Sequence, residues 1–331
     1  MILRSIVELN EQPNPLDLVD VPVPEPEPGE VLIRVSACGV CHTELDEIEG
    51  RTPPPVLPII LGHQIVGFVE RGGSRTSRHE PGQRVGVGWI HSSDGSPDEN
   101  LSEAFRATGR DVNGGYAEYV TVPEDYAYPI PDRLSDEHAA PLLCAGAIGH
   151  RALRLTGLED GQRLGLMGFG TSGHLVLQLA QHLYPRSEIY VFARDPVARE
   201  FAMRLGATWA GSTEERSPHP VHAVIDTTPA WRPVIEALAN LSPGGRLVIN
   251  AIRKEDGDKN SLLDLCYEEH LWMEREIKTV ANITARDIEE FLPLAAAIPI
   301  QVSVTTYPLE EANEALRDLR NGGTGGRVLL I

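Results

Sequence analysis

The sequence predicts an α/β protein built from a barrel-like β domain and a doubly wound parallel sheet. A chain of 331 residues exceeds the size at which one hydrophobic core usually stops growing, so two domains are expected. Near residue 149 the pattern changes from short strands separated by Gly and Pro to alternating strands and helices. Strand-like pieces return at the end, so we expect one domain at 1–148 and 284–331, with the other inserted at 149–283.

The first domain reads as short strands separated by turn residues. Prolines at positions 22, 24, 26 and 28 break residues 1–36 and favour an extended loop between strands. The polar segment Asp94–Asn113 has no periodicity and is interpreted as a surface loop, after which Gly114 opens another strand pair. The clearest predicted strands are Glu30–Ser36, Ile65–Val69 and Arg84–Trp89.

The second domain alternates between apolar strands and amphipathic helices, which predicts a parallel sheet. Its predicted strands are Arg163–Met167, Glu188–Ala193, Ala223–Asp226 and Arg246–Asn250. Its predicted helices are His174–Tyr184, Val197–Leu205 and Pro233–Leu241. The chain then closes with an acidic helix, Leu309–Arg320, and a strand, Arg327–Ile331.

Charge and composition exclude several classes of partner. A formal net charge of −19 argues against binding to nucleic acid or an anionic membrane, because phosphates repel such a surface. The N-terminus lacks the features of a signal peptide, and no apolar run is long enough to span a bilayer. Four cysteines in 331 residues fit a cytoplasmic protein with reduced thiols.

A glycine-rich turn follows the first strand of the second domain and opens its first helix. In this context Gly-x-Gly-x-x-Gly indicates a dinucleotide site. Gly168 permits the tight turn, Gly170 lets the backbone approach a pyrophosphate, and Gly173 lets helix and strand pack closely. Thr171 and Ser172 lie at the helix N-terminus, where free N–H groups face the phosphates. An ordinary turn between strand and helix is the alternative.

The end of the second strand of this domain favours NADP(H) over NAD(H). An NAD site usually has Asp or Glu here, whereas this chain has Ala193 followed by Arg194. A guanidinium pairs well with a 2′-phosphate, and Arg199 could reinforce it. Asp195 could instead hold a ribose or neutralise Arg194, and Arg194 could be a solvated residue at a helix start.

A metal site is predicted from three segments far apart in the sequence. Cys41, His63 and Cys144 offer two thiolates and an imidazole, the set with which catalytic zinc sites leave a fourth position open. Cys38 and Cys41 could also form a redox pair, but Cys38 is better read as a small buried apolar residue. Cys144 taken alone could be a core cysteine.

Together these segments resemble the zinc-dependent alcohol dehydrogenases of the medium-chain dehydrogenase/reductase family. The similarity extends over essentially the whole chain and adds Gly-Gly-Tyr-Ala-Glu-Tyr at 114–119 to Cys-Gly-Val-Cys-His-Thr-Glu, Leu-Gly-His-Gln and Leu-Leu-Cys-Ala-Gly-Ala. The resemblance implies a GroES-like catalytic domain, a Rossmann cofactor domain and an active site in the cleft between them. It also implies homodimers or homotetramers, joined through the edge of the Rossmann sheet.

The resemblance also implies a role for individual residues. The zinc ligands would be Cys41, His63 and Cys144, and zinc would polarise the oxygen of an alcohol or aldehyde. The other implied roles are proton relay at Thr43, support of the ligand His by Glu44, pyrophosphate binding at His42 and Arg327, and a substrate-pocket wall at Trp89.

Four departures from the family pattern stand out. The region around Asp94 and Ser102 has no Cys, which predicts no structural zinc. Gln64 replaces the common Glu beside the ligand His, and Glu49 stands near the place of the relay His. Ile148 replaces a common Thr beside the nicotinamide.

Two other functions compete with a zinc-dependent alcohol dehydrogenase. One is a zinc-independent NADPH quinone or enone reductase, although such relatives usually lack the ligand cysteines at 41 and 144. The other is a non-catalytic cofactor-binding protein on the same scaffold, because fold alone does not establish function.

Overall fold

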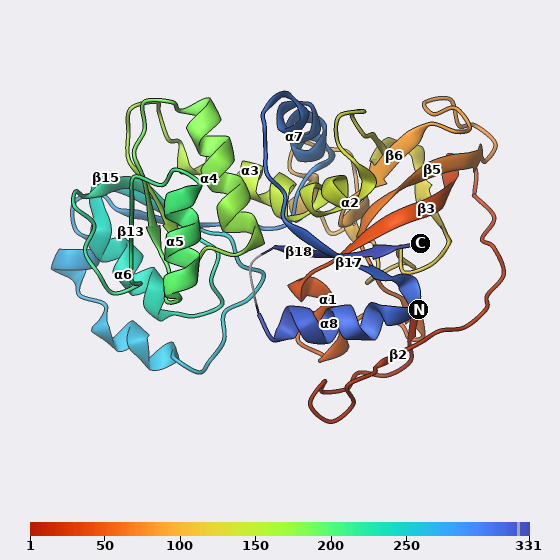
Figure 1. Ribbon diagram of the computed structural model, residues 1–331, viewed down its shortest axis with the longest axis horizontal. Coiled ribbons are helices and arrows are strands. Elements are labelled where there is room, and N and C mark those ends of the chain that lie inside the picture. The colour runs from red at the N-terminus through yellow and green to blue at the C-terminus, as the bar shows by residue number, and fades with distance from the viewer. Residues whose placement is uncertain (323–324) are drawn as a thin grey trace. The chain divides into compact units, whose positions relative to one another are not determined.

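The computed structural model describes residues 1–322 and 325–331 and divides into two compact units (Figure 1). The first, here the β unit, contains residues 1–147 and 282–331. The second, here the parallel-sheet unit, contains residues 148–281. The chain therefore leaves the β unit once and returns to it, so both of its terminal segments belong to one core.

The β unit is organised around a seven-stranded sheet in the order β10-β6-β5-β3-β18-β17, with β9 also paired to β3. Neighbours in it are antiparallel except β17 and β18, and Figure 1 shows β3, β5 and β6 side by side. Its strands are β3 (Glu30–Val40), β5 (Gln64–Gly72), β6 (Arg84–Val87), β9 (Tyr119–Pro123), β10 (Tyr128–Pro129), β17 (Val304–Pro308) and β18 (Gly326–Leu330). Smaller sheets join β1 (Ile2–Leu3), β2 (Leu16–Asp17) and β4 (Ile59–Ile60), and β7 (Ile90–Ser92) with β8 (Arg106–Ala107).

The central strand β3 is buried on both faces. Val31, Leu32 and Ile33 are each fully buried although successive side chains point to opposite faces. Such a strand needs cover on both sides, which agrees with the GroES-like fold expected from the sequence. The helices of this unit are α1 (His42–Ile48), α2 (Asp136–Ala139), α7 (Ala285–Ala297), α8 (Ala312–Arg320) and the short turns η1 (Glu99–Leu101), η2 (Glu124–Tyr126), η3 (Ala140–Leu143) and η6 (Leu309–Glu311).

The segment Asp94–Asn113 is not the simple surface loop that its polarity indicates. It contains η1 and β8, and the side chain of Glu99 is buried. One carboxylate oxygen of Glu99 accepts the Tyr126 hydroxyl proton at 2.8 Å, and the other accepts the Ala285 N–H at 2.7 Å. Hydrogen bonds from a polar side chain, rather than an apolar face, hold this segment, and hydrophobic periodicity cannot detect them.

The parallel-sheet unit has six strands in the order β13-β12-β11-β14-β15-β16. Numbered within the unit, this is 3-2-1-4-5-6, the order of dinucleotide-binding sheets, which confirms the predicted Rossmann-type fold. The strands are β11 (Leu164–Met167), β12 (Ile189–Phe192), β13 (Trp209–Gly211), β14 (Val221–Asp226), β15 (Leu241–Ile249) and β16 (Glu276–Thr279). The helices are α3 (Ala145–Thr156), which begins in the β unit, α4 (Thr171–Leu183), α5 (Pro196–Arg204), α6 (Arg232–Asn240), η4 (Lys259–Asp264) and η5 (Tyr267–Leu271).

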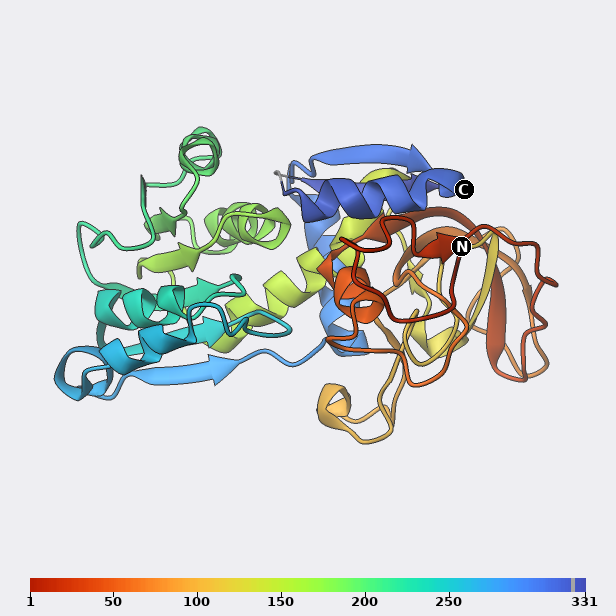
Figure 2. The ribbon, with the colours of Figure 1, turned by 90° about the horizontal axis from the view of Figure 1, so that it is seen from below.

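The strand order reverses between the parallel neighbours β11 and β14, because β12 and β13 are added on one side of β11 and β14 to β16 on the other. Right-handed crossovers place α4 and α5 on one face of the sheet and α6 on the other. Figure 2 shows these helices and the sheet from below. Ligands of such sheets bind outside the carboxyl ends of the strands, at the point where the order reverses.

Three of the elements that the sequence analysis missed, β13, β16 and α7, are instructive. The strands β13 and β16 lie at the two edges of the parallel sheet, and all four residues of β16 are exposed, so β16 has no apolar run to reveal it. Helix α7 carries a readable signal, because Thr284 and Asp287 form a capping box. Within the described residues, no helix is both long enough and apolar enough to cross a membrane.

We expect His91 to make the stability of the β unit depend on pH. Burial, and then the charge of Arg106, lower the pKa of His91 to about 4 from an ordinary value near 6.5. The folded state therefore prefers the neutral ring, so the stabilisation is complete above pH 6.5 and is lost as pH falls toward 4. The difference corresponds to about 3 kcal/mol.

The measurement is urea unfolding of the wild type and of His91→Asn at pH 7, 5.5 and 4. The amide can keep the contact that the His91 ring makes with the Ser92 hydroxyl at 3.2 Å. We expect the free energy of unfolding of the variant to fall less steeply with acid. Parallel pH profiles for the two proteins would contradict this role of His91.

Candidate active site

Two predicted zinc ligands meet because β3 and β5 are antiparallel neighbours. The register pairs Gly39 with Gln64, so Cys41, just after β3, and His63, just before β5, lie at the same end of the pair. Gly39 is needed there, since a Cβ at this position would lie 2.3 Å from Oε1 of Gln64. Close packing of the two strands therefore brings the thiol and the imidazole together.

The third predicted ligand, Cys144, directly follows η3. The ligand atoms of Cys41, His63 and Cys144 all lie within 4.8 Å of one another. Cys41 Sγ is 3.6 Å from His63 Nε2. His63 is buried, whereas both cysteines are partly exposed. Three donors thus converge from three segments of the β unit, and solvent reaches the site from the cysteine side.

Glu44 organises this group from the first turn of α1. Cys41 is the N-cap of α1, and its N–H donates to Glu44 Oε2 at 2.8 Å. The other oxygen, Oε1, lies 2.6 Å from Nδ1 of His63. A proton on Nδ1 leaves the Nε2 lone pair facing the cysteines, so Glu44 sets both the tautomer and the ring orientation of His63.

The charges in this group are strongly coupled. A hydrogen bond to Cys144, together with burial and the nearby Glu44, raises the pKa of Cys41 well above its usual value. Burial opposes charge on His63, but Glu44 and Cys41 prevail and raise the pKa of the ring well above its ordinary range. A divalent cation would displace these protons, so metal binding here is expected to release protons and to weaken in acid.

The donor set fits zinc. Two sulfur atoms and one imidazole nitrogen are the ligands of an open catalytic zinc site, and the carboxylate behind the imidazole is its usual support. The three donor atoms lie close enough together to bind one ion.

Glu47, which the sequence analysis did not single out, lies one turn after Glu44 on α1. It is fully buried, and neither of its oxygens has a hydrogen-bond partner among the described residues. Burial, with Glu44 as a second cause, raises the pKa of Glu47 well above its ordinary value. Two buried carboxyls on one helix thus differ in partners, and only the contacts of the folded chain distinguish them.

This pair provides a matched test of the support for His63. Glu44→Gln removes the negative charge 2.6 Å from Nδ1 and should weaken zinc binding by at least about tenfold. Glu47→Gln keeps the same shape and should leave zinc binding within a factor of about two, because Glu47 has no partner to lose. Competition with a zinc chelator measures both. Equal losses in the two variants would contradict the role of Glu44.

The other predicted residues of the β unit lie in different environments. Thr43 is partly exposed, and its N–H donates to Cys41 Sγ at 3.4 Å. His42 is exposed. Arg327 is buried, and its guanidinium donates to the Asp318 carboxylate at 2.8 Å and to the Gly322 and Gly325 carbonyls. Much of the hydrogen-bonding capacity of Arg327 is therefore already used within the β unit.

An aromatic surface lies beside the metal group. The Trp89 ring is 6.3 Å from the His63 ring and 5.8 Å from the ring of Phe105. Phe105 was missed because it lies in the polar segment interpreted as a loop. Both aromatic residues are partly exposed, so they can form an apolar wall next to the metal group.

Two sequence interpretations concern residues near this site. Cys38 is fully buried and has a free thiol, in agreement with its interpretation as a small apolar residue. Glu49 has bonds of its own: its carboxylate accepts from the Leu9 N–H and the guanidinium of Arg51 and pairs with Arg320. The carboxylate of Glu49 is therefore already engaged, and its pair with Arg320 joins the end of α1 to the end of α8.

The glycine turn of the parallel-sheet unit has the form that a dinucleotide requires. Gly168 has φ = +85°, and a Cβ there would lie 2.8 Å from the Thr227 hydroxyl. A Cβ on Gly173 would lie 2.8 Å from the Gly168 carbonyl oxygen. Gly170 has nothing within 4 Å of such an atom and is the N-cap of α4 without a side-chain cap. Helix α4 begins at Thr171, three residues earlier than predicted, so Thr171 and Ser172 form its first turn.

The residues after β12 have distinct functions in the fold. Asp195 is the N-cap of α5, where it accepts the Val197 N–H at 2.9 Å. Arg199 donates to the carbonyls of Ala193 and Arg194 at 2.8 and 3.0 Å. The side chain of Arg194 is exposed and has no hydrogen bond or ion pair among the described residues. Its guanidinium is therefore available to a ligand.

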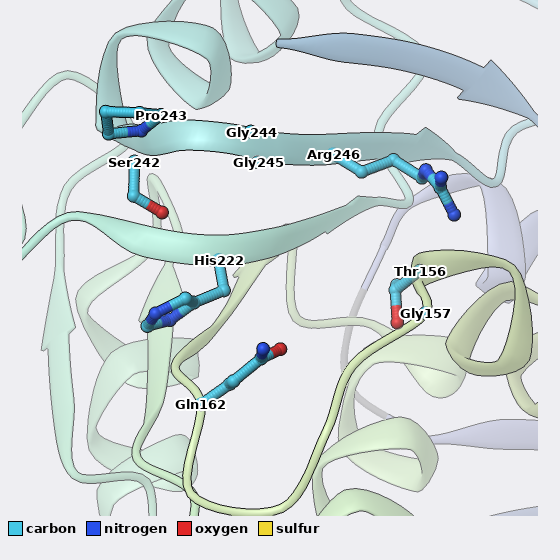
Figure 3. Close-up of a pocket in the computed structure, with 9 residues that line it drawn as sticks. All are labelled: Thr156, Gly157, Gln162, His222, Ser242, Pro243, Gly244, Gly245 and Arg246. Atoms are coloured by element: carbon cyan, nitrogen blue, oxygen red, sulfur yellow. The ribbon is translucent and has the colours of Figure 1, made fainter. Parts of the chain in front are cut away.

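A cavity of about 290 Å³ lies at the amino ends of the strands, the end of the sheet opposite to the glycine turn (Figure 3). His222, Ser242 and Arg246, at the amino ends of β14 and β15, are among its lining residues. No predicted site residue lines it, and dinucleotides bind at the carboxyl ends of such strands.

The fold and the metal group define the class of zinc-binding dehydrogenases, and comparison with known proteins agrees. Residues 27–132 match the family model of the alcohol dehydrogenase GroES-like domain, and residues 203–330 match that of the zinc-binding dehydrogenases. The chain belongs to the alcohol dehydrogenases of the medium-chain dehydrogenase/reductase family.

Individual relatives cover nearly the whole chain. "Probable alcohol dehydrogenase AdhA" of Mycobacterium tuberculosis is 40% identical, over 96% of this chain and 93% of the relative. An alcohol dehydrogenase of Geobacillus stearothermophilus is 33% identical, over 96% of each chain. The solved alcohol dehydrogenase of Aeropyrum pernix is similar in fold, with a TM-score of 0.84 and 24% identity over 100% of this chain and 99% of that one. This protein is thus an alcohol dehydrogenase-like oxidoreductase.

Proposed function

We propose that the protein is a zinc-dependent alcohol dehydrogenase that transfers a hydride between NADP(H) and a small alcohol or aldehyde. The observation that carries the proposal is the convergence of Cys41, His63 and Cys144 within 4.8 Å, with Glu44 behind the imidazole. Zinc bound there would act as a Lewis acid on the substrate oxygen. We assign the catalytic role to the β unit and the dinucleotide to the parallel-sheet unit.

The chain's own residues have separate tasks in this reaction. Glu44 keeps His63 in the tautomer that presents Nε2. The hydroxyl of Thr43, next to the ligand Cys41 in α1, relays the proton of the alcohol. Trp89 and Phe105 hold the carbon chain of the substrate and exclude water. His42 and Arg327 remain proposed contacts to the pyrophosphate.

The cofactor preference is proposed from the residues after β12. The free guanidinium of Arg194 can pair with a 2′-phosphate. Arg199 holds the two carbonyls at this strand end and so positions Arg194. One carboxylate oxygen of Asp195 is engaged as the cap of α5, which supports Arg194 rather than Asp195 as the residue that contacts the cofactor.

A screen of primary alcohols, secondary alcohols and polyols with NADP and NAD in parallel, combined with metal analysis, tests the proposal. We expect one zinc per chain, turnover that a chelator abolishes, and faster reduction of NADP. Turnover of quinones or enones that survives removal of zinc would identify a zinc-independent reductase instead. Bound zinc and dinucleotide without turnover of any substrate would indicate a non-catalytic protein.

We also propose a homo-oligomer joined through β16, in a compartment that keeps thiols reduced. This strand ends the parallel sheet, and its four residues are exposed, so its outer backbone groups are free to pair with a second copy. Ile277 on β16 and the nearby Trp272 and Met273 are about half exposed. Light scattering should give a dimer or tetramer for the wild type, and Ile277→Lys should shift it toward monomer. A monomeric wild type would contradict the interface.

A further inference from the structure

A buried ion pair lies at the carboxyl ends of the strands of the parallel-sheet unit, where the dinucleotide is expected to bind. The proposed mechanism does not use this pair. Asp226 is the last residue of β14, at the point where the strand order reverses, and its side chain is fully buried. Lys254 lies in the loop after β15, and its side chain is 9% exposed. The distance from Lys254 Nζ to Asp226 Oδ2 is 2.5 Å.

Lys254 uses its whole donor capacity in this position. Besides the carboxylate of Asp226, its ammonium donates to the carbonyls of Thr228 at 2.8 Å and Ala230 at 2.9 Å. An ammonium has three N–H donors, and all three have partners here. The planar, larger guanidinium of an arginine could not reproduce this arrangement. The site is therefore specific for lysine.

The pair joins the loops that follow β14 and β15. Asp226 Oδ1 also accepts from the Thr228 N–H at 2.9 Å and the Thr228 hydroxyl at 2.8 Å. The Glu255 N–H donates to the Pro229 carbonyl at 2.7 Å, next to the Lys254 contacts. Lys254 thus acts as a clamp between the loop at 226–230 and its own loop, 250–258.

The clamped loop forms one wall of the glycine turn. The Thr227 N–H donates to the Met167 carbonyl at 3.0 Å, and a Cβ on Gly168 would meet the side chains of Thr227 and Thr228 within 3 Å. The shape of the turn that receives the pyrophosphate therefore depends on where residues 227 and 228 are held. Lys254 holds this loop through the carboxylate of Asp226 and the carbonyls of Thr228 and Ala230.

A buried ion pair is a weak source of stability, because desolvation of both charges offsets their attraction, and apolar replacements often fold equally well. Loss of Lys254 alone, however, would leave the Asp226 carboxylate unpaired beside the place expected for an anionic cofactor. Burial already raises the pKa of Asp226, against the influence of Lys254.

We propose that Lys254, through Asp226 and the Thr228 and Ala230 carbonyls, is a positioning residue that holds the dinucleotide turn in its binding shape. The inference rests on the proposed function, because it concerns affinity for the proposed cofactor. It adds a residue outside the glycine motif and the residues after β12 to the determinants of cofactor binding.

The test measures binding of NADPH and NADH to the full-length protein by calorimetry at a temperature where every variant is folded. In Lys254→Met, we expect the dissociation constant to rise about tenfold or more, with the zinc content unchanged, because the zinc ligands belong to the β unit. The control is Lys259→Met, since Lys259 is 58% exposed and, within residues 1–322 and 325–331, its ammonium pairs only with the exposed Asp256. Its affinity should stay at the wild-type value.

A double variant, Asp226→Asn with Lys254→Met, separates positioning from stability. It contains no buried unpaired charge, so its thermal stability should return toward the wild type, while its affinity for the dinucleotide stays low. Wild-type affinity in Lys254→Met, or affinity that recovers together with stability in the double variant, would overturn the inference while the proposed function stands. A wild type that binds neither dinucleotide would overturn both.

Discussion

Cys41→Ala is expected to abolish turnover while the protein still binds the dinucleotide. The variant loses one of three donors that lie within 4.8 Å of one another, and two remaining ligands hold zinc poorly. Lewis-acid stabilisation of the substrate oxygen is worth several kcal/mol, so loss of the metal should reduce kcat/KM by about a thousandfold or more. Metal analysis and kinetics on the same preparation measure both effects.

Cys38→Ala is the matched control, because Cys38 is the other member of the Cys-x-x-Cys pair and lies fully buried away from solvent. We expect full zinc content and nearly unchanged turnover from it. Equal loss of activity in both variants would support a redox pair. An active Cys41→Ala protein would rule out the proposed mechanism.

Arg194→Ala is expected to remove the preference for NADP(H). The Arg194 side chain is exposed and has no partner in the described part of the chain, so its guanidinium is available to donate to a 2′-phosphate. Two charge-assisted hydrogen bonds correspond to about a hundredfold in affinity. The ratio of the dissociation constants of NADPH and NADH should change by that factor, with affinity for NADH nearly constant.

Arg204→Ala provides the comparison at the other end of α5. Arg194 precedes the N-cap of α5, whereas Arg204 is the last residue of the helix and stacks on the ring of Phe201. Its removal should change affinity for neither dinucleotide. If Arg194→Ala weakened binding of NADPH and NADH equally, Arg194 would be a general phosphate contact, and the preference for NADP(H) would need another source.

The fold class was predictable because local patterns repeat along the chain. Alternation of strand and helix after residue 149 indicated a parallel sheet, and the strand order confirms it. The edge strand β16 escaped prediction because none of its residues is buried. Helix α7 was missed for another reason, since the capping box at Thr284 and Asp287 was present but not used.

The residue types at the metal site were visible in the sequence, but their surroundings were not. Glu44 and Glu47 are equivalent in a sequence, being acidic residues three apart on one short helix. In the folded chain the Glu44 carboxylate contacts His63, whereas the Glu47 carboxylate has no hydrogen-bond partner among the residues that the structure describes. Phe105 likewise lies in a segment that the sequence predicts to be a polar loop. Only the folded structure shows that its ring packs beside Trp89.

The sequence by itself determined the alternation of strands and helices after residue 149, the glycine turn at 168–173, and the chemical identity of three candidate ligands. These features depend on residues that are neighbours in the chain, where backbone preference and periodicity act. Only the tertiary structure decided that Cys41, His63 and Cys144 converge, and that Lys254 reaches Asp226. Such contacts join residues tens of positions apart, because strand register and burial, which no local pattern encodes, bring them together.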